Sequence, residues 1–149
     1  MKQRSAGVAI RRGDLLPDVA LPLIRGGRIE PLRPAFGRTT VLLILHEPFC
    51  PSCQHYLDEL GELSEEFSIW EGRLLVVAPD TSPAYRCPGF GLPVRDPENR
   101  LGTRGMAYFL VADRYGQVWE AAPAGDSHPF PPPREITEWL KYLGTLCPE

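Results

Sequence analysis

Two continuous runs of apolar residues are the clearest signals along the chain. Residues Thr39 to His46 are β-branched and apolar through their middle, and Arg73 to Pro79 have the same character, as buried strands do. Between the runs, apolar positions recur every three or four residues and acidic residues occupy the other face, which predicts an amphipathic helix. The apolar positions of that helix are Cys53, Leu57, Leu60, Leu63, Phe67 and Trp70. Strand, helix and strand in this order predict a parallel, right-handed β-α-β unit.

Shorter elements are expected on either side of this unit. Frequent Gly and Pro around short apolar stretches predict an edge hairpin between residues 13 and 34. Residues 80–105 contain four prolines and are expected to be irregular, with a short helix over Glu98 to Gly102 as an option. Runs at 106–112 and 117–121 flank a turn sequence and predict two antiparallel strands.

A second amphipathic segment near the C-terminus predicts the last helix. Its shared apolar face consists of Ile136, Trp139, Leu140 and Leu143. The expected fold class is therefore α/β, with a central mixed sheet flanked by helices and an N-terminal edge hairpin.

Length and composition are those of one ordinary domain. The chain has 149 residues, of which 43% are hydrophobic and 23% charged. We expect a flexible N-terminal segment over residues 1–12 and one domain over residues 13–149. The longest apolar run is Met106 to Ala112, far shorter than the roughly 18 residues of a membrane span, and the N-terminus is charged. No membrane partner is expected, and the expected location is the cytoplasm.

Charge excludes two further classes of function. The formal net charge is −3 and the cations are scattered, so nucleic acid is not an expected partner. Lys2 and Lys141 are the only lysines, which argues against a lysine nucleophile.

The residues that indicate chemistry are a cysteine pair, Cys50-Pro51-Ser52-Cys53, between the first buried strand and its helix. Unpaired N–H groups and the dipole at a helix N-terminus favour an anion, so Cys50 is expected to be the more acidic thiol and the nucleophile. Cys53, one helical turn on, is placed to resolve a mixed disulfide. Pro51 costs no hydrogen bond in the first turn, and the Ser52 hydroxyl is a candidate partner for the Cys50 sulfur.

Three motifs in order give the sequence a resemblance to a known family. They are Gly13-Asp14-x-x-Pro17-Asp18-x-x-Leu21, Phe49-Cys50-Pro51-Ser52-Cys53, and Leu110-Val111-Ala112-Asp113-Arg114-Tyr115-Gly116. The chain resembles thioredoxin-fold redoxins, as a peroxiredoxin-like member of the alkyl hydroperoxide reductase and thiol-specific antioxidant group. The resemblance covers roughly residues 13–143 and implies a thioredoxin-like fold and thiol redox activity.

The sequence departs from the peroxiredoxin pattern at the positions that bind peroxide. The threonine or serine three residues before the reactive cysteine is Glu47 here, and the proline seven before it is Leu43. The active-site arginine of the family aligns with Ala107, with Arg104 nearby as a candidate replacement. A carboxylate at Glu47 raises the pKa of a neighbouring thiol, and it can also relay a proton. Hydroperoxide reduction is therefore the less favoured reaction.

The thioredoxin pattern is also incomplete. The cis-proline that faces the cysteine pair in thioredoxins matches Ala107 or Tyr108, and their buried acid aligns with Ile44. Glu47, His46 or water are then the candidates for transferring protons to and from the thiols. The candidates for tuning the thiols are Glu47, His46, Ser52, Pro51 and Arg104. The candidates for lining a substrate groove are Phe49, Met106 and Ala107.

The first hypothesis is a thiol-disulfide oxidoreductase that uses Cys50 and Cys53, and the alternative is a thiol-dependent peroxidase with Cys50 as the peroxidatic cysteine. A redox-inactive or metal-binding module is a third reading, although no second Cys-x-x-Cys is present to complete a zinc site. Cys87 and Cys147 are either additional resolving thiols or buried structural residues. No cofactor and no metal are expected. The expected partners are a disulfide or hydroperoxide substrate and a thiol electron donor, and the oligomeric state stays open.

Overall fold

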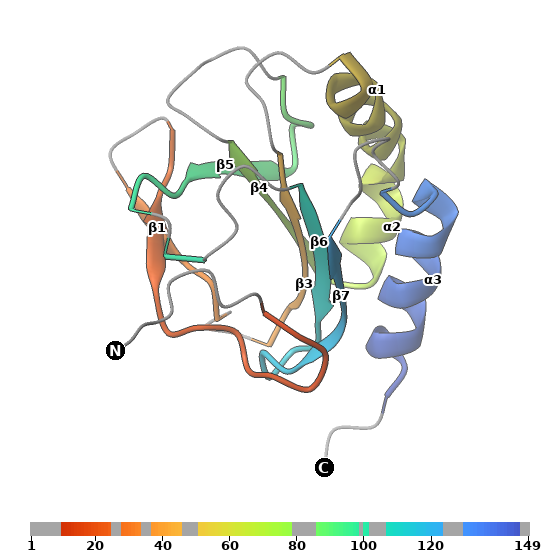
Figure 1. Ribbon diagram of the computed structural model, residues 1–149. Helices are drawn as coiled ribbons and strands as arrows, with labels where there is room; N and C mark the ends of the chain where they lie inside the picture. The colour runs from red at the N-terminus through yellow and green to blue at the C-terminus, as the bar shows by residue number, and fades with distance from the viewer. Residues whose placement is uncertain are drawn as a thin grey trace.

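A five-stranded mixed sheet forms the centre of the computed structural model, which describes residues 10–24, 28–33, 37–45, 51–78, 86–98, 100–101, 107–123 and 130–146. Its strands are β3 (Thr39–Ile44), β4 (Gly72–Ala78), β5 (Gly91–Arg95), β6 (Tyr108–Ala112) and β7 (Val118–Pro123). They are arranged in the order β5-β4-β3-β6-β7 (Figure 1). β3, β4 and β5 are parallel, whereas β6 is antiparallel to β3 and β7 is antiparallel to β6. The predicted parallel β-α-β unit and the predicted antiparallel strand pair are both confirmed.

The helical segment between β3 and β4 is broken, where the sequence predicts one helix. It consists of α1 (Pro51–Leu60), the 3-10 turn η1 (Gly61–Leu63) and α2 (Ser64–Ile69). The break begins at Gly61, a residue that weakens an α-helix because its backbone is the most flexible. The apolar positions still face inward across the break, since Leu57, Leu60 and Phe67 are all fully buried.

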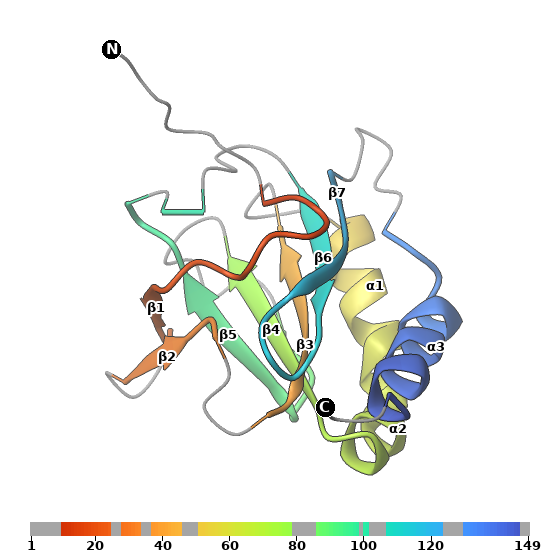
Figure 2. The same ribbon diagram turned by 90° about the horizontal axis from the view of Figure 1, so that it is seen from below.

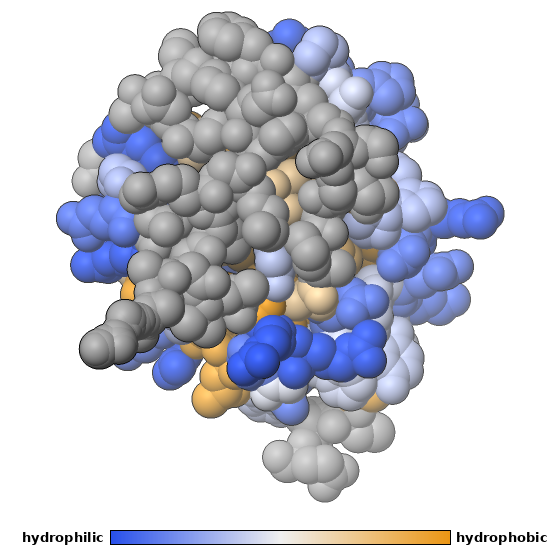
Figure 3. Space-filling model, viewed as in Figure 1, coloured by the Kyte–Doolittle hydropathy of each residue, from blue (hydrophilic) through white to orange (hydrophobic). Residues whose placement is uncertain are grey.

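Helices cover one face of the sheet. The last helix, α3 (Pro133–Gly144), lies beside α1 and α2 on that side (Figures 1 and 2). Alternate residues of a strand point to opposite faces, so Val41 and Leu43 pack in the core beneath the helices and Leu42 and Ile44 pack in the core on the other side. The outer faces of the helices are hydrophilic (Figure 3).

The predicted N-terminal hairpin is confirmed, and it covers the opposite face of the sheet (Figure 2). β1 (Ala20–Pro22) and β2 (Ile29–Pro31) pair antiparallel as a separate two-stranded sheet. A bridge between Leu23 and Val94 connects this hairpin to β5.

A buried arginine fixes the hairpin to the central sheet. The Arg73 side chain in β4 is 5% exposed, and its Nη1 lies 2.9 Å from Glu30 Oε2 and donates to Pro31 O at 2.7 Å. Its Nη2 donates to Leu32 O and to Thr40 Oγ1. The carboxylate and backbone carbonyls of the hairpin region therefore compensate the cost of burying this cation.

The prediction of an irregular segment over residues 80–105 is wrong for Gly91–Arg95, which form β5 at the edge of the sheet. The sequence did not predict this strand because Pro93 lies in its middle, and a proline argues against a central strand. A proline is tolerated at a sheet edge, and its carbonyl accepts a hydrogen bond from Ile24 N at 3.0 Å. Of the optional helix over Glu98 to Gly102, the described residues 98, 100 and 101 lie in turns, and the Asp96 carboxylate accepts hydrogen bonds from Arg100 N and Leu101 N.

Residues 10–12 contact the sheet. Ile10 is buried, and its carbonyl accepts a 2.5 Å hydrogen bond from the Tyr108 hydroxyl. Arg12 forms a 3.0 Å ion pair with Glu120 in β7. The boundary between a flexible segment and the domain at residue 12 stays a prediction. Across the described residues, no helix is long and apolar enough to cross a membrane.

Candidate active site

The cysteine motif follows the end of β3 at the edge of the sheet where the parallel strands finish. Leu45 comes directly after β3, and its N–H donates to Val77 O at 3.0 Å, which fixes this edge to β4. The first residue of α1 is Pro51, so Cys50 directly precedes the helix in the sequence. Residues 46–50 lie outside the described part of the chain. The carboxyl edge of parallel strands is the usual place for a site in an open α/β sheet.

Cys53 lies in the first turn of α1 and is fully buried, with 0% of its surface exposed. It belongs to the core beneath the helices together with Leu45 and Ala107. Pro51 and Ser52, by contrast, are exposed. Solvent and large reagents therefore reach the outer side of this turn and not Cys53.

The first turn of α1 has a favourable electrostatic environment for an anion. The helix is ten residues long and carries no acidic residue in its first turn. Its N-terminal N–H groups carry partial positive charge, and no acidic side chain in the turn offsets it. This arrangement favours the thiolate form of a cysteine at the position before the helix.

One side of α1 is linked to the residues that precede α3. The Tyr56 ring stacks on Phe130 with a centroid distance of 5.0 Å and an interplanar angle of 22°. The Tyr56 hydroxyl donates a 2.5 Å hydrogen bond to Pro131 O. Burial, and then the negative charges of Glu135 and Glu59, raise the pKa of Tyr56 well above its ordinary value, so the phenol stays a donor.

The other side of α1 is linked to the segment that leads into β5. The Gln54 side chain donates through Nε2 to Arg86 O at 3.0 Å and accepts through Oε1 from Arg86 N at 2.8 Å. Gln54 Nε2 also lies 3.0 Å from Asp58 Oδ1, within hydrogen-bond distance. Sequence reasoning missed both this link and that of Tyr56, because the partners are 32 and 75 positions apart and no local pattern marks them.

Cys87 follows Arg86 and lies on the helix side of the sheet. It is partly buried and packs against the core that contains Cys53. Its Sγ would lie 2.6 Å from a Cβ added at Gly91, and the neighbouring Phe90 ring contacts Phe67 with a centroid distance of 4.8 Å. Burial raises the pKa of the Cys87 thiol to about 11, so it is protonated at neutral pH.

The structure describes four of the ten candidate site residues, Cys53, Pro51, Ser52 and Ala107. Ala107 is buried, with 3% of its surface exposed, and its role in lining a substrate groove stays a prediction. The other six candidates are Cys50, Glu47, His46, Arg104, Phe49 and Met106, and they lie outside the described residues together with Cys147. Among the described residues, no group of three or more His, Cys, Asp or Glu side chains is arranged to hold a metal ion.

Comparisons place this arrangement in a known fold. No protein family and no curated relative matches the sequence. Solved structures do match in three dimensions. A peroxiredoxin-like protein from Aquifex aeolicus matches with a TM-score of 0.74 at 14% identity, over 93% of this chain and 90% of that one. Peroxiredoxin Q from Xanthomonas campestris matches with a TM-score of 0.69 at 17% identity, over 95% of this chain and 100% of that one.

A third match comes from another functional class. A putative thiol:disulfide interchange protein DsbE from Chlorobium tepidum matches with a TM-score of 0.67 at 19% identity, over 91% of this chain and 99% of that one. The fold is thus the thioredoxin-like fold that peroxiredoxins and disulfide interchange proteins share, as the sequence resemblance implies.

Proposed function

We propose that this protein is a thiol-disulfide oxidoreductase whose redox couple is Cys50 and Cys53. The observation that carries the proposal is the position of Cys53, fully buried in the first turn of a helix that follows a parallel strand. Because Cys53 is buried, Cys50 is the cysteine that reacts with the substrate, and Cys53 reacts with Cys50 inside the protein.

The proposed reaction exchanges one disulfide for another. The Cys50 thiolate attacks one sulfur of a substrate disulfide, forms a mixed disulfide and releases the other substrate sulfur as a thiolate. The Cys53 sulfur, after losing its proton, then attacks Cys50 and releases the second substrate thiolate. Two electrons pass from the Cys50–Cys53 dithiol to the substrate, and the resulting disulfide is reduced again by a thiol donor.

The proton released by Cys53 needs an acceptor. Glu47 and His46, which follow β3 in the sequence, are the proposed candidates, with water as the third. The Ser52 hydroxyl and Arg104 are proposed to stabilise the Cys50 thiolate.

A hydroperoxide reductase is the second candidate, and the similarity to peroxiredoxin Q favours it. The bacterioferritin comigratory protein of Xanthomonas campestris, which matches with a TM-score of 0.68, has alkyl peroxide reduction activity. In that reaction the Cys50 thiolate attacks the peroxide oxygen, which releases an alcohol and leaves a sulfenic acid at Cys50. Cys53 then displaces water from Cys50 to form the same disulfide. The missing peroxide-binding hydroxyl and arginine make this the second candidate.

The test compares two oxidants on one set of variants. Reduced protein is mixed with insulin in one arm and with micromolar hydroperoxide in the other, and thiol loss and insulin turbidity are followed. We expect insulin reduction in the wild type, none in Cys50→Ser, and a trapped mixed disulfide in Cys53→Ser. Cys87→Ser is the matched control and should retain activity.

Each result separates the candidates. Fast oxidation of Cys50 by hydroperoxide with slow insulin reduction would replace the first candidate by the second. Undiminished insulin reduction by Cys50→Ser, or inactivity of the folded wild type in both arms, would overturn the oxidoreductase proposal altogether. The proposed partners are a disulfide or hydroperoxide substrate and a thiol donor, and the cytoplasmic location stays a prediction.

A further inference from the structure

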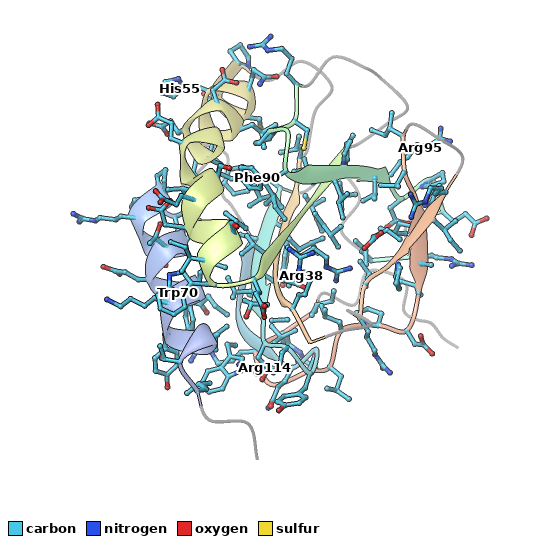
Figure 4. All side chains as sticks on the ribbon, turned by 180° about the vertical axis from the view of Figure 1, so that it is seen from behind. Arg38, His55, Trp70, Phe90, Arg95 and Arg114 are labelled. Carbon is cyan, nitrogen blue, oxygen red and sulfur yellow. The ribbon has the colours of Figure 1, made fainter. Side chains whose placement is uncertain are left out.

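Three arginines lie on neighbouring segments at the amino end of β3, at the edge of the sheet opposite the cysteine motif. Arg33 follows β2, Arg38 precedes β3, and Arg114 lies in the turn between β6 and β7. We call Arg33, Arg38 and Arg114 the arginine cluster. Arg38 and Arg114 are labelled in Figure 4, in the lower half of the view.

Two glycines allow these segments to approach one another. A Cβ at Gly37 would lie 3.8 Å from Arg114 Cβ, and a Cβ at Gly116 would lie 3.7 Å from Arg33 Cγ. Both glycines have positive φ angles, 69° and 85°, which other residues adopt at a cost. The paired stretch of β3 and β6 ends at Thr40 and Ala112, and Arg38 and Arg114 each lie two residues beyond it, so both are at the same end of the sheet.

Backbone carbonyls, and not carboxylates, hold two of the three guanidinium groups. Arg33 Nε donates to Leu16 O at 2.7 Å, and Arg38 Nη2 donates to Gly72 O at 2.9 Å. Among the described residues, no carboxylate lies within ion-pair distance of the arginine cluster. A carbonyl orients a guanidinium without neutralising it, so full positive charge and further N–H donors remain for a ligand.

The neighbouring charges do not neutralise the cluster. The Asp113 carboxylate is engaged by Tyr115 N, Gln117 N and Trp119 Nε1. Glu30 pairs with Arg73, and the positive charge of Arg38 is close enough to act on Arg73 as a like charge. Glu71 directly precedes Gly72, but it is exposed and forms no ion pair with the arginine cluster among the described residues. Arg38 and Arg73 therefore repel each other, and an anion bound at Arg38 would relieve that repulsion.

We propose that the arginine cluster is a binding site for an oligophosphate group, either free or as part of a nucleotide. Planar guanidinium groups match phosphate oxygens in paired hydrogen bonds, and three of them suit an anion with several charges. Tyr115, 61% exposed and next to Arg114 in the same turn, offers a ring on which a nucleotide base can stack. The site lies at the edge opposite the cysteine motif and is independent of the proposed redox function.

The test measures binding by calorimetry at low salt, with tripolyphosphate and ATP as probes. We expect both to bind, and we expect the affinity to fall as salt rises to about 0.15 M, where screening acts within roughly 8 Å. Arg38→Gln and Arg114→Gln should each weaken binding by about tenfold, the usual effect of losing a charged hydrogen bond. Among the described residues Arg114 forms no side-chain hydrogen bond, so Arg114→Gln removes none there, and the melting temperature verifies its fold.

Arg100→Gln serves as the matched control, and Tyr115→Ala distinguishes a nucleotide from a free oligophosphate. Arg100→Gln changes an exposed arginine that pairs with Glu98, at 3.3 Å, and should leave binding unchanged. Tyr115→Ala should weaken ATP binding and spare tripolyphosphate if the ligand is a nucleotide, and spare both if it is a free oligophosphate. Failure of both probes to bind the folded wild type, or an equal loss in Arg100→Gln and Arg114→Gln, would overturn the proposal. Insulin reduction should be unchanged in every variant.

Discussion

The side chain of Gln54 and the backbone of Arg86 form two hydrogen bonds, so the first turns of α1 are fixed directly to the segment that carries Cys87. The same amide also lies within hydrogen-bond distance of the Asp58 carboxylate. One α1 side chain, next to the buried Cys53, therefore links the helix to the segment that begins at Arg86.

The first prediction is that Gln54→Ala frees the Cys87 segment. The loss of two hydrogen bonds at a partly exposed site should lower the free energy of unfolding by about 1 kcal/mol. Alkylation of Cys87 in the native protein should accelerate, as measured by mass spectrometry after timed labelling. His55→Ala, an exposed change on the same helix, should do neither. Equal labelling rates in both variants would show that the Gln54 link does not protect Cys87.

A second prediction concerns the packing of Gly91 against Cys87. In Gly91→Ala, the new Cβ meets Cys87 Sγ at 2.6 Å and Leu74 Cδ2 at 3.3 Å. This overpacking should cost about 1–3 kcal/mol in urea unfolding. Gly89→Ala is the control, because nothing lies within 4 Å of its added Cβ. Adding Cys87→Ala to Gly91→Ala should recover part of the loss, and purely additive effects would argue against this contact.

The third prediction is a pH dependence that arises from Cys87. Its pKa is raised from 9.0 to about 11 by burial, so the folded state favours the neutral thiol. The stability that this thiol contributes is complete below pH 9 and is lost as the pH rises from about 9 to about 11. When the free energy of unfolding is plotted against pH, the curves of the wild type and Cys87→Ala should therefore diverge across this range and run parallel below it. Parallel curves up to pH 11 would contradict the burial of Cys87.

A fourth prediction addresses the hydrogen bond between Tyr56 and Pro131. Tyr56→Phe retains the stacking on Phe130 but leaves the Pro131 carbonyl without this donor. The free energy of unfolding should fall by about 1–2 kcal/mol. Tyr115→Phe removes a hydroxyl from an exposed ring and should change the stability by less than about 0.5 kcal/mol. The hydrogen bond contributes nothing if the two variants unfold at the same urea concentration.

The fifth prediction is that Arg73 is among the most sensitive charged positions for folding. Arg73→Leu leaves Glu30 and the carbonyls of the hairpin region without their donor, and should cost about 3 kcal/mol. Arg73→Lys should recover only part of the loss, since one ammonium group cannot reach the same set of acceptors. Thermal unfolding measures both, with Arg100→Leu as the exposed control. A melting temperature of Arg73→Leu equal to that of the control would contradict a stabilising role.

The local pattern of apolar and polar residues was sufficient to predict most of the central strands and helices. The apolar runs that became β3 and β4 are buried on both faces, so their character is continuous and visible without knowledge of their partners. The position of Cys50 and Cys53 between a strand and a helix could likewise be predicted, because both neighbouring elements are encoded within some thirty residues. The order of these elements predicted a mixed sheet flanked by helices, and the resemblance carried by the three motifs implied that it is the thioredoxin-like fold.

Tertiary structure alone decided the features that depend on distant partners. β5 forms around Pro93 because β4 on one side and Leu23 on the other supply its pairing, and neither partner is visible in its own sequence. The burial of Ala107, the links made by Gln54 and Tyr56, and the proximity of the segments that carry Arg33, Arg38 and Arg114 all depend on residues far apart in the chain. Local propensity is a property of neighbours in sequence, whereas these contacts are fixed by the packing of the whole sheet against its helices and hairpin.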